Sequence, residues 1–480
     1  MAFTASFVER VRLVLRFRPH DTSTAHGRSH ERYRRMTFTT AAALGARAIA
    51  LLTSLVSVPL TFRYLGAEQY GLWMVLASFI SAMGFADLGI GNGVMNAVSE
   101  AYGKDDHDLA RQYVSSGLAL MLGIAVVLAL AGAIAYPFIP WLRVFNVKSA
   151  AVAAEGARAF LVLFCWFVVN IPLDVVTRAQ AGMQRAYWSQ TVNACGNILS
   201  LLGLIAVVEL RGSLAWLVFA STAGVVAATI FNGWILFRDC PWMFPSWGDF
   251  RGTAVGKIFK LGLLFFVLQC ASAVSYTSDN IVIAQVLGAA AVAVYAVPQK
   301  LFSFVSMLLN IGMAPTWPAY AEAATRGDAA WVRKAFRYSM CISLGIAVPI
   351  CTALALLGPW IIRVAVGKTL HAPKQLLWAL AVWGIIAAAS FPMSMLLNGL
   401  EALRAQTLIA IVASTINLGL SIVLTYRLGV IGVCLGSIFT QAFISCPLYI
   451  LVIHSALGEI GKGRGEAPEP KYPLTSSETC

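Results

Sequence analysis

Six ionisable side chains lie inside long apolar segments of this sequence, where a charge is costly. They are three cations and three carboxylates: Arg47, Arg178, Lys300, Asp87, Asp174 and Asp279. On insertion scales, each Arg, Lys or Asp at the centre of a membrane helix costs about 2.5–3.5 kcal/mol. Such a side chain normally faces an oppositely charged partner or a water-filled path. These residues are therefore the candidates for handling a polar solute inside a membrane.

Two of the predicted ion pairs fall in the first half of the chain. Asp174 and Arg178 are four residues apart, so they share one face of a helix and can pair along it. Arg47 and Asp87 lie at similar depths in neighbouring apolar segments, because each residue of a helix advances it by about 1.5 Å. The spacing therefore predicts one pair within a helix and one pair between helices.

The third predicted pair, Asp279 with Lys300, lies at matching depth in the second half. Two interpretations stay open for all three pairs. The pairs can hold neighbouring helices together, or the cations can bind an anionic solute while the carboxylates bind H⁺ or Na⁺. A cation is needed in the second case because an unpaired anion in a low dielectric is prohibitively unstable.

Three prolines inside apolar segments, Pro172, Pro298 and Pro392, are candidates for gating kinks. Proline removes a backbone hydrogen bond and can bend a membrane helix. A bend of this kind suits a helix that moves during gating, and it is equally compatible with a static kink. Both interpretations stay open.

The elements that must position these residues are long apolar helices. The chain of 480 residues is 59% hydrophobic and only 12% charged, so a soluble fold would lack the polar surface that water requires. Apolar runs of roughly 20 residues, long enough to cross a bilayer, recur throughout. We expect about twelve spans, with the ranges 41–62, 71–95, 114–138, 159–180, 188–208, 214–237, 260–285, 290–315, 337–362, 375–398, 405–426 and 430–453.

The net charge of +13 is interpreted as a topology signal and not as a nucleic-acid surface. Basic residues are retained on the cytoplasmic side of a membrane, and with the N-terminus inside, most of the 35 Lys and Arg fall in cytoplasmic segments. We therefore expect a multi-pass protein of the bacterial inner (cytoplasmic) membrane with both termini cytoplasmic. Residues 1–40 form a basic N-terminal tail in this scheme, and 454–480 form the C-terminal tail.

The sequence repeats itself. Leu65-Gly66-Ala67 aligns with Leu287-Gly288-Ala289, and at the same offset Glu100 aligns with Glu322. The repeat predicts two pseudo-symmetric six-helix bundles, 41–237 and 260–453, joined by a cytoplasmic linker at 238–259. Six spans per half is an even number, so both halves enter the membrane in the same orientation. We therefore expect an all-α polytopic membrane protein with its bundles around a central cavity.

The sequence offers little for catalysis. The nine cysteines are scattered without metal-ligand spacing and are interpreted as apolar fillers. We find no metal site, catalytic residue, nucleophile elbow or Gly-rich nucleotide loop. A non-enzymatic transporter is expected, with no cofactor and with H⁺ or Na⁺ as the coupling ion.

Four segments, in their order along both halves, resemble a known family. YLGAEQYGLW (64–73) joins the first two spans and is followed by FADLGIG (85–91), while SDNIVIAQVLG (278–288) leads into VYAVPQKL (294–301). Together they resemble the polysaccharide-transporter branch of the multidrug/oligosaccharidyl-lipid/polysaccharide exporter superfamily. This branch includes the O-antigen and exopolysaccharide repeat-unit flippases. The resemblance covers residues 38–455.

The resemblance implies translocation of an undecaprenyl-diphosphate-linked oligosaccharide from the cytoplasmic to the periplasmic leaflet by alternating access. The diphosphate would then be the anionic group that Arg47, Arg178 and Lys300 bind. The partners would be this lipid-linked substrate, the membrane lipids and other membrane proteins of glycan assembly, with no nucleic acid. Two alternatives stay open. One is a drug/cation antiporter of the same superfamily, and the other is a membrane-embedded glycan polymerase or ligase.

Overall fold

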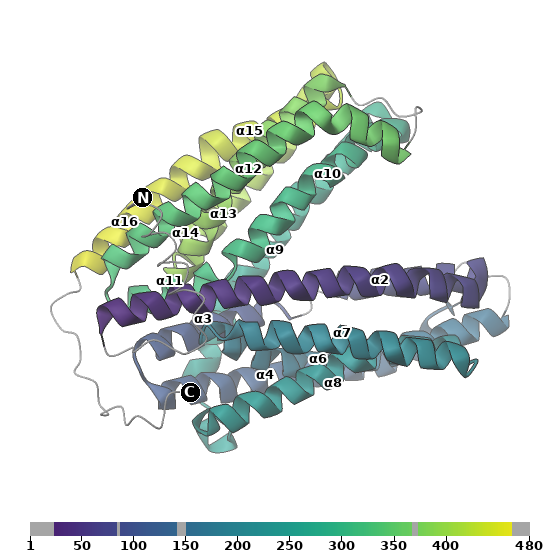
Figure 1. The fold of residues 1–480 in the computed structure, drawn as a ribbon, viewed down its shortest axis with the longest axis horizontal. Helices are drawn as coiled ribbons and strands as arrows, with labels where there is room; N and C mark the ends of the chain where they lie inside the picture. Colours follow the sequence, from purple (N-terminus) through teal and green to yellow (C-terminus); the bar gives the residue numbers. More distant parts are fainter. Residues whose placement is uncertain (1–23, 84–86, 142–149, 367–372, 463–480) are drawn as a thin grey trace, which may run out of the picture. The chain divides into compact units, whose positions relative to one another are not determined.

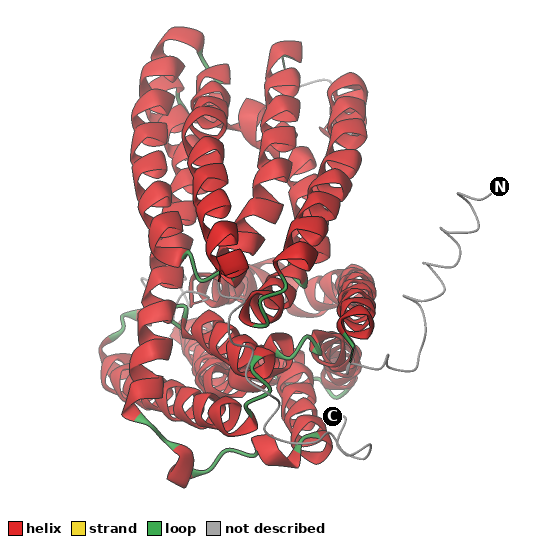
Figure 2. Cartoon of the chain, turned by 90° about the vertical axis from the view of Figure 1, so that its left-hand side faces the viewer, coloured by secondary structure: helices red, strands yellow, loops and turns green. Residues whose placement is uncertain are grey.

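The computed structural model describes residues 24–83, 87–141, 150–366 and 373–462, and within these ranges it contains helices and connecting segments but no strand (Figures 1 and 2). Eleven helices of the described ranges are long and apolar enough to cross a membrane. The prediction of an all-α polytopic membrane protein is thereby confirmed. The chain divides into two compact units, one ending at Leu263 and the other beginning at Leu264.

The first unit is built from α2 to α8 and the start of α9. The bounds are α2 (Ala25–Met83), α3 (Ile90–Gly103), α4 (His107–Ala135), η1 (Tyr136–Phe138), α6 (Ala150–Gly182), α7 (Ala186–Glu209), α8 (Leu214–Asp239), η2 (Pro241–Met243), η3 (Trp247–Asp249) and α9 (Gly252–Leu287). Its core joins α3, α6 and α9 through buried Val94, Val175 and Ile258. These apolar side chains cannot reach lipid, so they fix the helices that carry the charged residues.

The second unit comprises the rest of α9 and the helices that follow it. The bounds are α10 (Ala289–Met313), α11 (Thr316–Thr325), α12 (Ala329–Val366), α13 (Lys374–Gly399), α14 (Leu403–Leu428), α15 (Ile431–Thr440), the π-helix η4 (Gln441–Ser445) and α16 (Cys446–Lys462). α13 is the central helix of this unit, and its Leu376, Leu377 and Leu380 are fully buried in the core. The apolar faces of the outer helices remain exposed, as expected for side chains that meet lipid.

Matching backbone turns support the predicted repeat. Gly66, where α2 breaks, has φ 71° and ψ 176°, and Gly288, which precedes α10, has φ 88° and ψ 162°. Only glycine adopts such angles without strain. Asp106 and Asp328 likewise occupy matching positions, since each side chain accepts a hydrogen bond from the backbone N–H three residues further on. The same sequence signals therefore produce the same turn and the same helix cap in both halves.

An ion pair also recurs. Lys104 Nζ lies 2.6 Å from Glu100 Oε1, and Arg326 Nε lies 2.5 Å from Glu322 Oε1. Each pair links residues four apart at the end of a short helix, α3 in one unit and α11 in the other. The repeat thus extends from the apolar pattern to specific polar contacts.

The second predicted span, 71–95, differs from the structure because it is interrupted. α2 ends at Met83 and α3 begins only at Ile90. Leu88 and Gly89, directly before α3, have φ values of 49° and 70°, so the backbone there is not helical. In the second half, α10 continues to Met313, and only a two-residue turn at 314–315 separates it from α11. The break places Asp87 in a turn and not on a helix.

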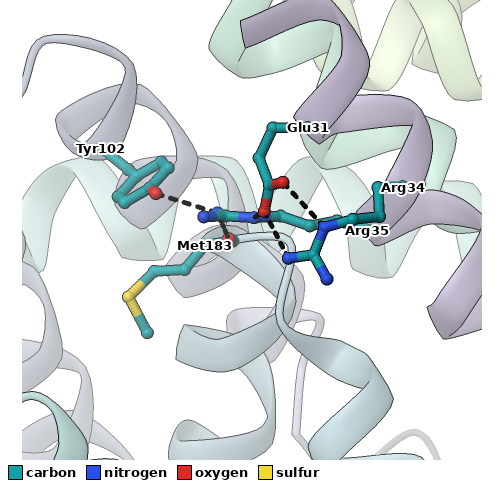
Figure 3. Close-up of polar contacts among 5 residues, drawn as sticks. All are labelled: Glu31, Arg34, Arg35, Tyr102 and Met183. Atoms are coloured by element: carbon teal, nitrogen blue, oxygen red, sulfur yellow. Dashed lines mark hydrogen bonds and ion pairs between the residues drawn. The ribbon is translucent and has the colours of Figure 1, made fainter. Parts of the chain in front are cut away.

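The N-terminal region also differs from the predicted tail, because α2 begins at Ala25 and includes residues 25–40. Figure 3 shows the contacts that fix this part of α2. Arg35 donates hydrogen bonds to Tyr102 Oη (2.9 Å) and to the backbone oxygen of Met183 (3.0 Å). Glu31 lies 2.8 Å from Arg35 and 2.6 Å from Arg34. The shared carboxylate makes it feasible to bury two guanidinium groups, of which Arg35 joins α2 to α3 and to Met183.

The predicted linker is packed against the first unit. Met243 is fully buried, the rings of Trp242 and His107 stack at 4.1 Å, and Asp249 forms a 2.8 Å ion pair with Arg111 of α4. The division between the units falls after this segment, at Leu263. The segment that follows α8 is therefore a structural part of the first unit.

Candidate functional site

Three of the predicted charged residues, Asp87, Asp174 and Arg178, meet where α3 begins. The turn before α3 is closed by Asp87, whose side chain accepts a hydrogen bond from Gly89 N (3.0 Å) and whose carbonyl accepts one from Ile90 N (2.9 Å). This turn directs the first residues of α3, including Asn92, toward α6. The turn therefore places Asp87 and Asn92 beside Arg178 of α6.

Arg178 of α6 is the centre of this cluster. Its Nε donates to Asp174 Oδ2 at 2.7 Å, and its NH1 donates to Asn92 Oδ1 at 2.7 Å. Asp87 also interacts electrostatically with Arg178. A Cβ atom on Gly91 would lie only 2.8 Å from Arg178 Nε, so the missing side chain makes room for the guanidinium. We call Asp87, Asn92, Asp174 and Arg178 the α3–α6 cluster.

The α3–α6 cluster is accessible and carries a net negative charge. The side chains of Arg178 and Asp174 are 32% and 29% exposed, so solvent or a solute can reach them. With both carboxylates ionised, the formal charge is −1. The cluster can accept a cation or a proton directly, and its guanidinium can offer hydrogen bonds to a phosphate.

Of the three predicted pairs, the structure contains Asp174–Arg178. Asp87 lies by Arg178 instead of by its expected partner, Arg47. Arg47 is exposed on α2, on a face that also exposes Leu44, Leu51 and other large apolar side chains. Equal depth was therefore a weaker guide than helical spacing, because depth says nothing about the direction in which a side chain points.

The predicted pair of Asp279 and Lys300 is not formed either. Tyr295 Oη donates to Asp279 Oδ2 at 2.8 Å, and the other oxygen, Oδ1, is buried with no hydrogen-bond partner among the described residues. Lys300 is exposed on α10. Asp279, which is only 5% exposed, is thus a buried carboxyl group held by a phenol.

The three predicted gating prolines lie inside helices that continue through them. Pro172 is in α6, Pro298 in α10 and Pro392 in α13. Pro172 lies about half a turn before Asp174, so a change of bend there would move the α3–α6 cluster. Their role in gating stays a prediction.

Sequence reasoning missed the neutral partners in these sites. Asn92 and Tyr295 both lie in apolar segments and both hydrogen-bond to a charged group. An amide or phenol at such a place is a usable signal, because a polar group in a membrane core seeks a partner. It also missed Lys257, which forms a short ion pair with Glu100, because the two residues are distant in sequence.

A family model described as "Polysaccharide biosynthesis protein" matches residues 39–324, which is more than half of the chain. The chain belongs to this family. A second model, MatE, matches residues 265–423, and both models fall within the superfamily named above. The polysaccharide biosynthesis model includes the whole α3–α6 cluster together with Asp279 and Lys300.

Curated relatives of this polysaccharide biosynthesis family member share low sequence identity with it. It is 21% identical to "Uncharacterized membrane protein EpsK" of Bacillus subtilis over 426 residues, which cover 87% of this chain and 83% of that protein. It is also 21% identical to the "Putative O-antigen export protein" of Yersinia pseudotuberculosis over 290 residues, which cover 60% of this chain and 65% of that protein.

The fold is shared with a known class of transporters. A crystal structure of MATE in the straight conformation has a TM-score of 0.74 and 16% identity, and the match covers 95% of this chain and 99% of that one. Identity at this level shows a common fold and nothing finer. The two family models, together with the eleven long apolar helices of the described ranges, make this family member a membrane transporter of the superfamily.

Proposed function

We propose that this transporter is a flippase that moves an undecaprenyl-diphosphate-linked oligosaccharide from the cytoplasmic to the periplasmic leaflet of the inner membrane. The observation that carries the proposal is the match to the polysaccharide biosynthesis family over residues 39–324. The Yersinia relative, named an O-antigen export protein, supports an O-antigen substrate. The proposal includes cytoplasmic termini, alternating access and contact with other membrane proteins of glycan assembly.

The chemistry of the headgroup requires cations. A diphosphate loses its hydration when it crosses the membrane, and an arginine can replace that hydration with two parallel hydrogen bonds. Arg178 is the best candidate because its side chain is one-third exposed while Asp174 and Asn92 hold it in place. A solute phosphate would then approach a guanidinium whose position is already fixed.

Arg47 and Lys300 are proposed as further headgroup cations. Both lie well inside apolar helices and both are exposed. A cation that lies inside an apolar helix and remains exposed faces either lipid, at a cost of several kcal/mol, or a polar path. We propose that both side chains line the path of the diphosphate.

Asp279 is proposed as the carboxyl group that couples transport to an ion gradient. Ionising a carboxyl group with an unpartnered oxygen in a buried site is unfavourable, and uptake of H⁺ or Na⁺ removes that penalty. Tyr295 Oη, at 2.8 Å, can donate to the ionised form. Asp87 and Asp174 are alternative coupling groups, but the guanidinium of Arg178 already balances part of their charge.

A drug/cation antiporter is the second candidate, and the formal charge of −1 on the α3–α6 cluster favours it. Amphiphilic cations would be attracted to Asp87 and Asp174. The MATE fold is compatible with this function as well. The two functions therefore differ in which charge of the same cluster meets the solute.

Reconstitution of the purified chain in lipid vesicles tests both functions. Vesicles carrying a fluorescent lipid-linked oligosaccharide in both leaflets are treated with a membrane-impermeant quencher, with and without an imposed pH or Na⁺ gradient. A flippase makes the inner-leaflet fluorescence accessible in a protein-dependent manner. Ethidium uptake is measured in matched vesicles. Gradient-driven ethidium transport without oligosaccharide flipping would replace the flippase proposal with the antiporter.

A further inference from the structure

The segment that joins α8 to α9 exposes three large aromatic side chains. Phe244, Trp247 and Phe250 are 62%, 82% and 44% exposed. In water, such exposure is unfavourable, whereas the boundary between lipid headgroups and acyl chains is the environment that tryptophan and other aromatic rings prefer. The exposed rings therefore indicate that this segment lies at a membrane surface.

The aromatic segment is held firmly in place on α4. Ser115 Oγ accepts a hydrogen bond from Ser246 N, and Ser116 Oγ accepts one from Arg251 N, both at 3.1 Å. The ion pair between Arg111 and Asp249 fixes the same segment. A loop restrained at several points keeps its aromatic rings exposed because the fold holds them there, not because the loop is loose.

A small cavity lies between the aromatic segment and α4, beside these hydrogen bonds. Its volume is about 110 Å³, and its lining is mainly apolar, from Leu118, Leu122, Pro245, Trp247 and Phe250, with Ser115 and Ser246 as its polar members. Sites for drug-sized ligands are larger, about 300–1,000 Å³, so an oligosaccharide does not fit. The apolar lining suits a short length of hydrocarbon.

The cavity continues into an apolar stripe along α4. Leu122, Val126, Leu130 and Ile134 are spaced by four residues, so they lie on one face of the helix. Their exposed fractions are 37%, 55%, 59% and 68%. An acyl chain that begins in the cavity can therefore follow α4 toward the centre of the bilayer.

A cation lies beside the cavity. Arg251 directly follows Phe250, is exposed, and donates from NH1 to the backbone oxygens of Gly248 (3.1 Å) and Phe250 (3.2 Å). These contacts orient the guanidinium at the outer edge of the aromatic segment. The nearest acid in sequence, Asp249, is engaged by Arg111. A positive charge next to an apolar cavity is complementary to an anionic lipid.

We propose that α4 and the segment 244–251 form a binding site for an anionic phospholipid. The lipid phosphate binds Arg251, and one acyl chain passes Trp247 and Phe250 and follows the stripe on α4. The site lies within the first unit and is separate from the α3–α6 cluster. It serves to anchor the segment between the two halves at a fixed depth in the membrane, and it does not depend on the proposed substrate.

Photo-crosslinking of the full chain in vesicles tests the site. Diazirine-bearing phosphatidylglycerol and phosphatidylcholine are compared at equal density, and the labelled peptides are identified by mass spectrometry. Phosphatidylglycerol is expected to label the segment 244–251 and α4 more strongly than phosphatidylcholine. Arg251→Gln should lower this preference about fivefold, the value of one cation near an anionic surface. Trp247→Ala should lower labelling by both lipids.

Arg238→Gln is the matched control, because Arg238 lies near the same segment but stacks on Trp234 at 5.3 Å. It should leave the lipid preference unchanged. Thermal unfolding of each variant in detergent verifies that it is folded. Equal labelling by the two lipids in the wild type, an unchanged preference in folded Arg251→Gln, or crosslinks confined to other helices would each overturn the proposal.

Discussion

Removing the guanidinium of the α3–α6 cluster is the most informative perturbation of this transporter. Arg178→Gln keeps a hydrogen-bonding side chain of similar length but removes the charge. Asp174, whose Oδ2 lies 2.7 Å from Arg178 Nε, then loses its counter-ion, and Asp87 loses its electrostatic partner. The single variant is therefore expected to affect both the stability of the unit and any function that depends on the cation.

The two effects are similar in size, so stability and transport must be measured separately. Breaking a buried ion pair lowers the free energy of unfolding by about 3–5 kcal/mol, and breaking an exposed one lowers it by about 0–1 kcal/mol. The side chains of Arg178 and Asp174 are 32% and 29% exposed, so we expect Arg178→Gln to lower the free energy of unfolding by about 1–3 kcal/mol. Hydrogen bonds from a charged donor to a bound phosphate contribute about 1.5–3 kcal/mol. Since about 1.4 kcal/mol corresponds to a factor of ten, transport should fall roughly ten- to a hundredfold.

A double variant separates the two effects. Asp174→Asn combined with Arg178→Gln replaces the ion pair by two neutral amides that can hydrogen-bond to each other. It should recover most of the unfolding temperature and membrane level that Arg178→Gln loses. The flipping rate in vesicles should stay low, because the cation for the diphosphate is still missing. Arg158→Gln is the matched control, since Arg158 is an exposed arginine on the same helix outside the cluster.

The reasoning fails if the double variant flips the oligosaccharide at the wild-type rate. That result would reduce Arg178 to a structural partner of Asp174. Recovery of neither stability nor transport would show instead that the cluster tolerates no neutral replacement. In that case Arg178→Lys, which keeps the charge but loses the planar fork, is the next test, and it should retain partial transport.

Two further predictions concern contacts outside the cluster. Burial opposes ionisation of Glu100, but hydrogen bonds from Lys104 and Lys257 outweigh it and hold the pKa of this carboxyl below its ordinary value. The ionised Glu100 therefore stabilises the folded state. This stabilisation is complete above the unfolded-state pKa and is lost as the pH falls through the folded-state pKa. The unfolding temperatures of wild type and Glu100→Gln should therefore differ near neutral pH and converge in acid. Gly224→Ala should lower the free energy of unfolding in detergent by about 1–3 kcal/mol, because the new Cβ would lie 2.4 Å from a backbone nitrogen of α7. Gly123→Ala is the control and should unfold like the wild type, since its Cβ would have no atom within 4 Å.

The length and periodicity of apolar runs determined most of the fold. The predicted spans fall on helical segments of the described residues, although 41–62 and most of 71–95 share α2 and 430–453 is divided among α15, η4 and α16, because a membrane leaves the backbone few alternatives to a helix. The repeated glycine at Gly66 and Gly288 was visible in the sequence, and it marks the same positive-φ turn in both halves. The pair Asp174–Arg178 was equally predictable, since residues four apart on a helix must lie on one face.

Tertiary structure decided everything that depends on the direction of a side chain or on contacts between distant segments. The break before α3 places Asp87 by Arg178, and packing brings Asp279 to Tyr295. Matching depth in the sequence had instead paired Asp87 with Arg47 and Asp279 with Lys300. The burial of Arg35 on Tyr102 and the docking of the 238–259 segment on α4 had no local signal. Helical spacing is a property of the chain itself, whereas the rotation of each helix about its axis is set by the neighbours against which it packs.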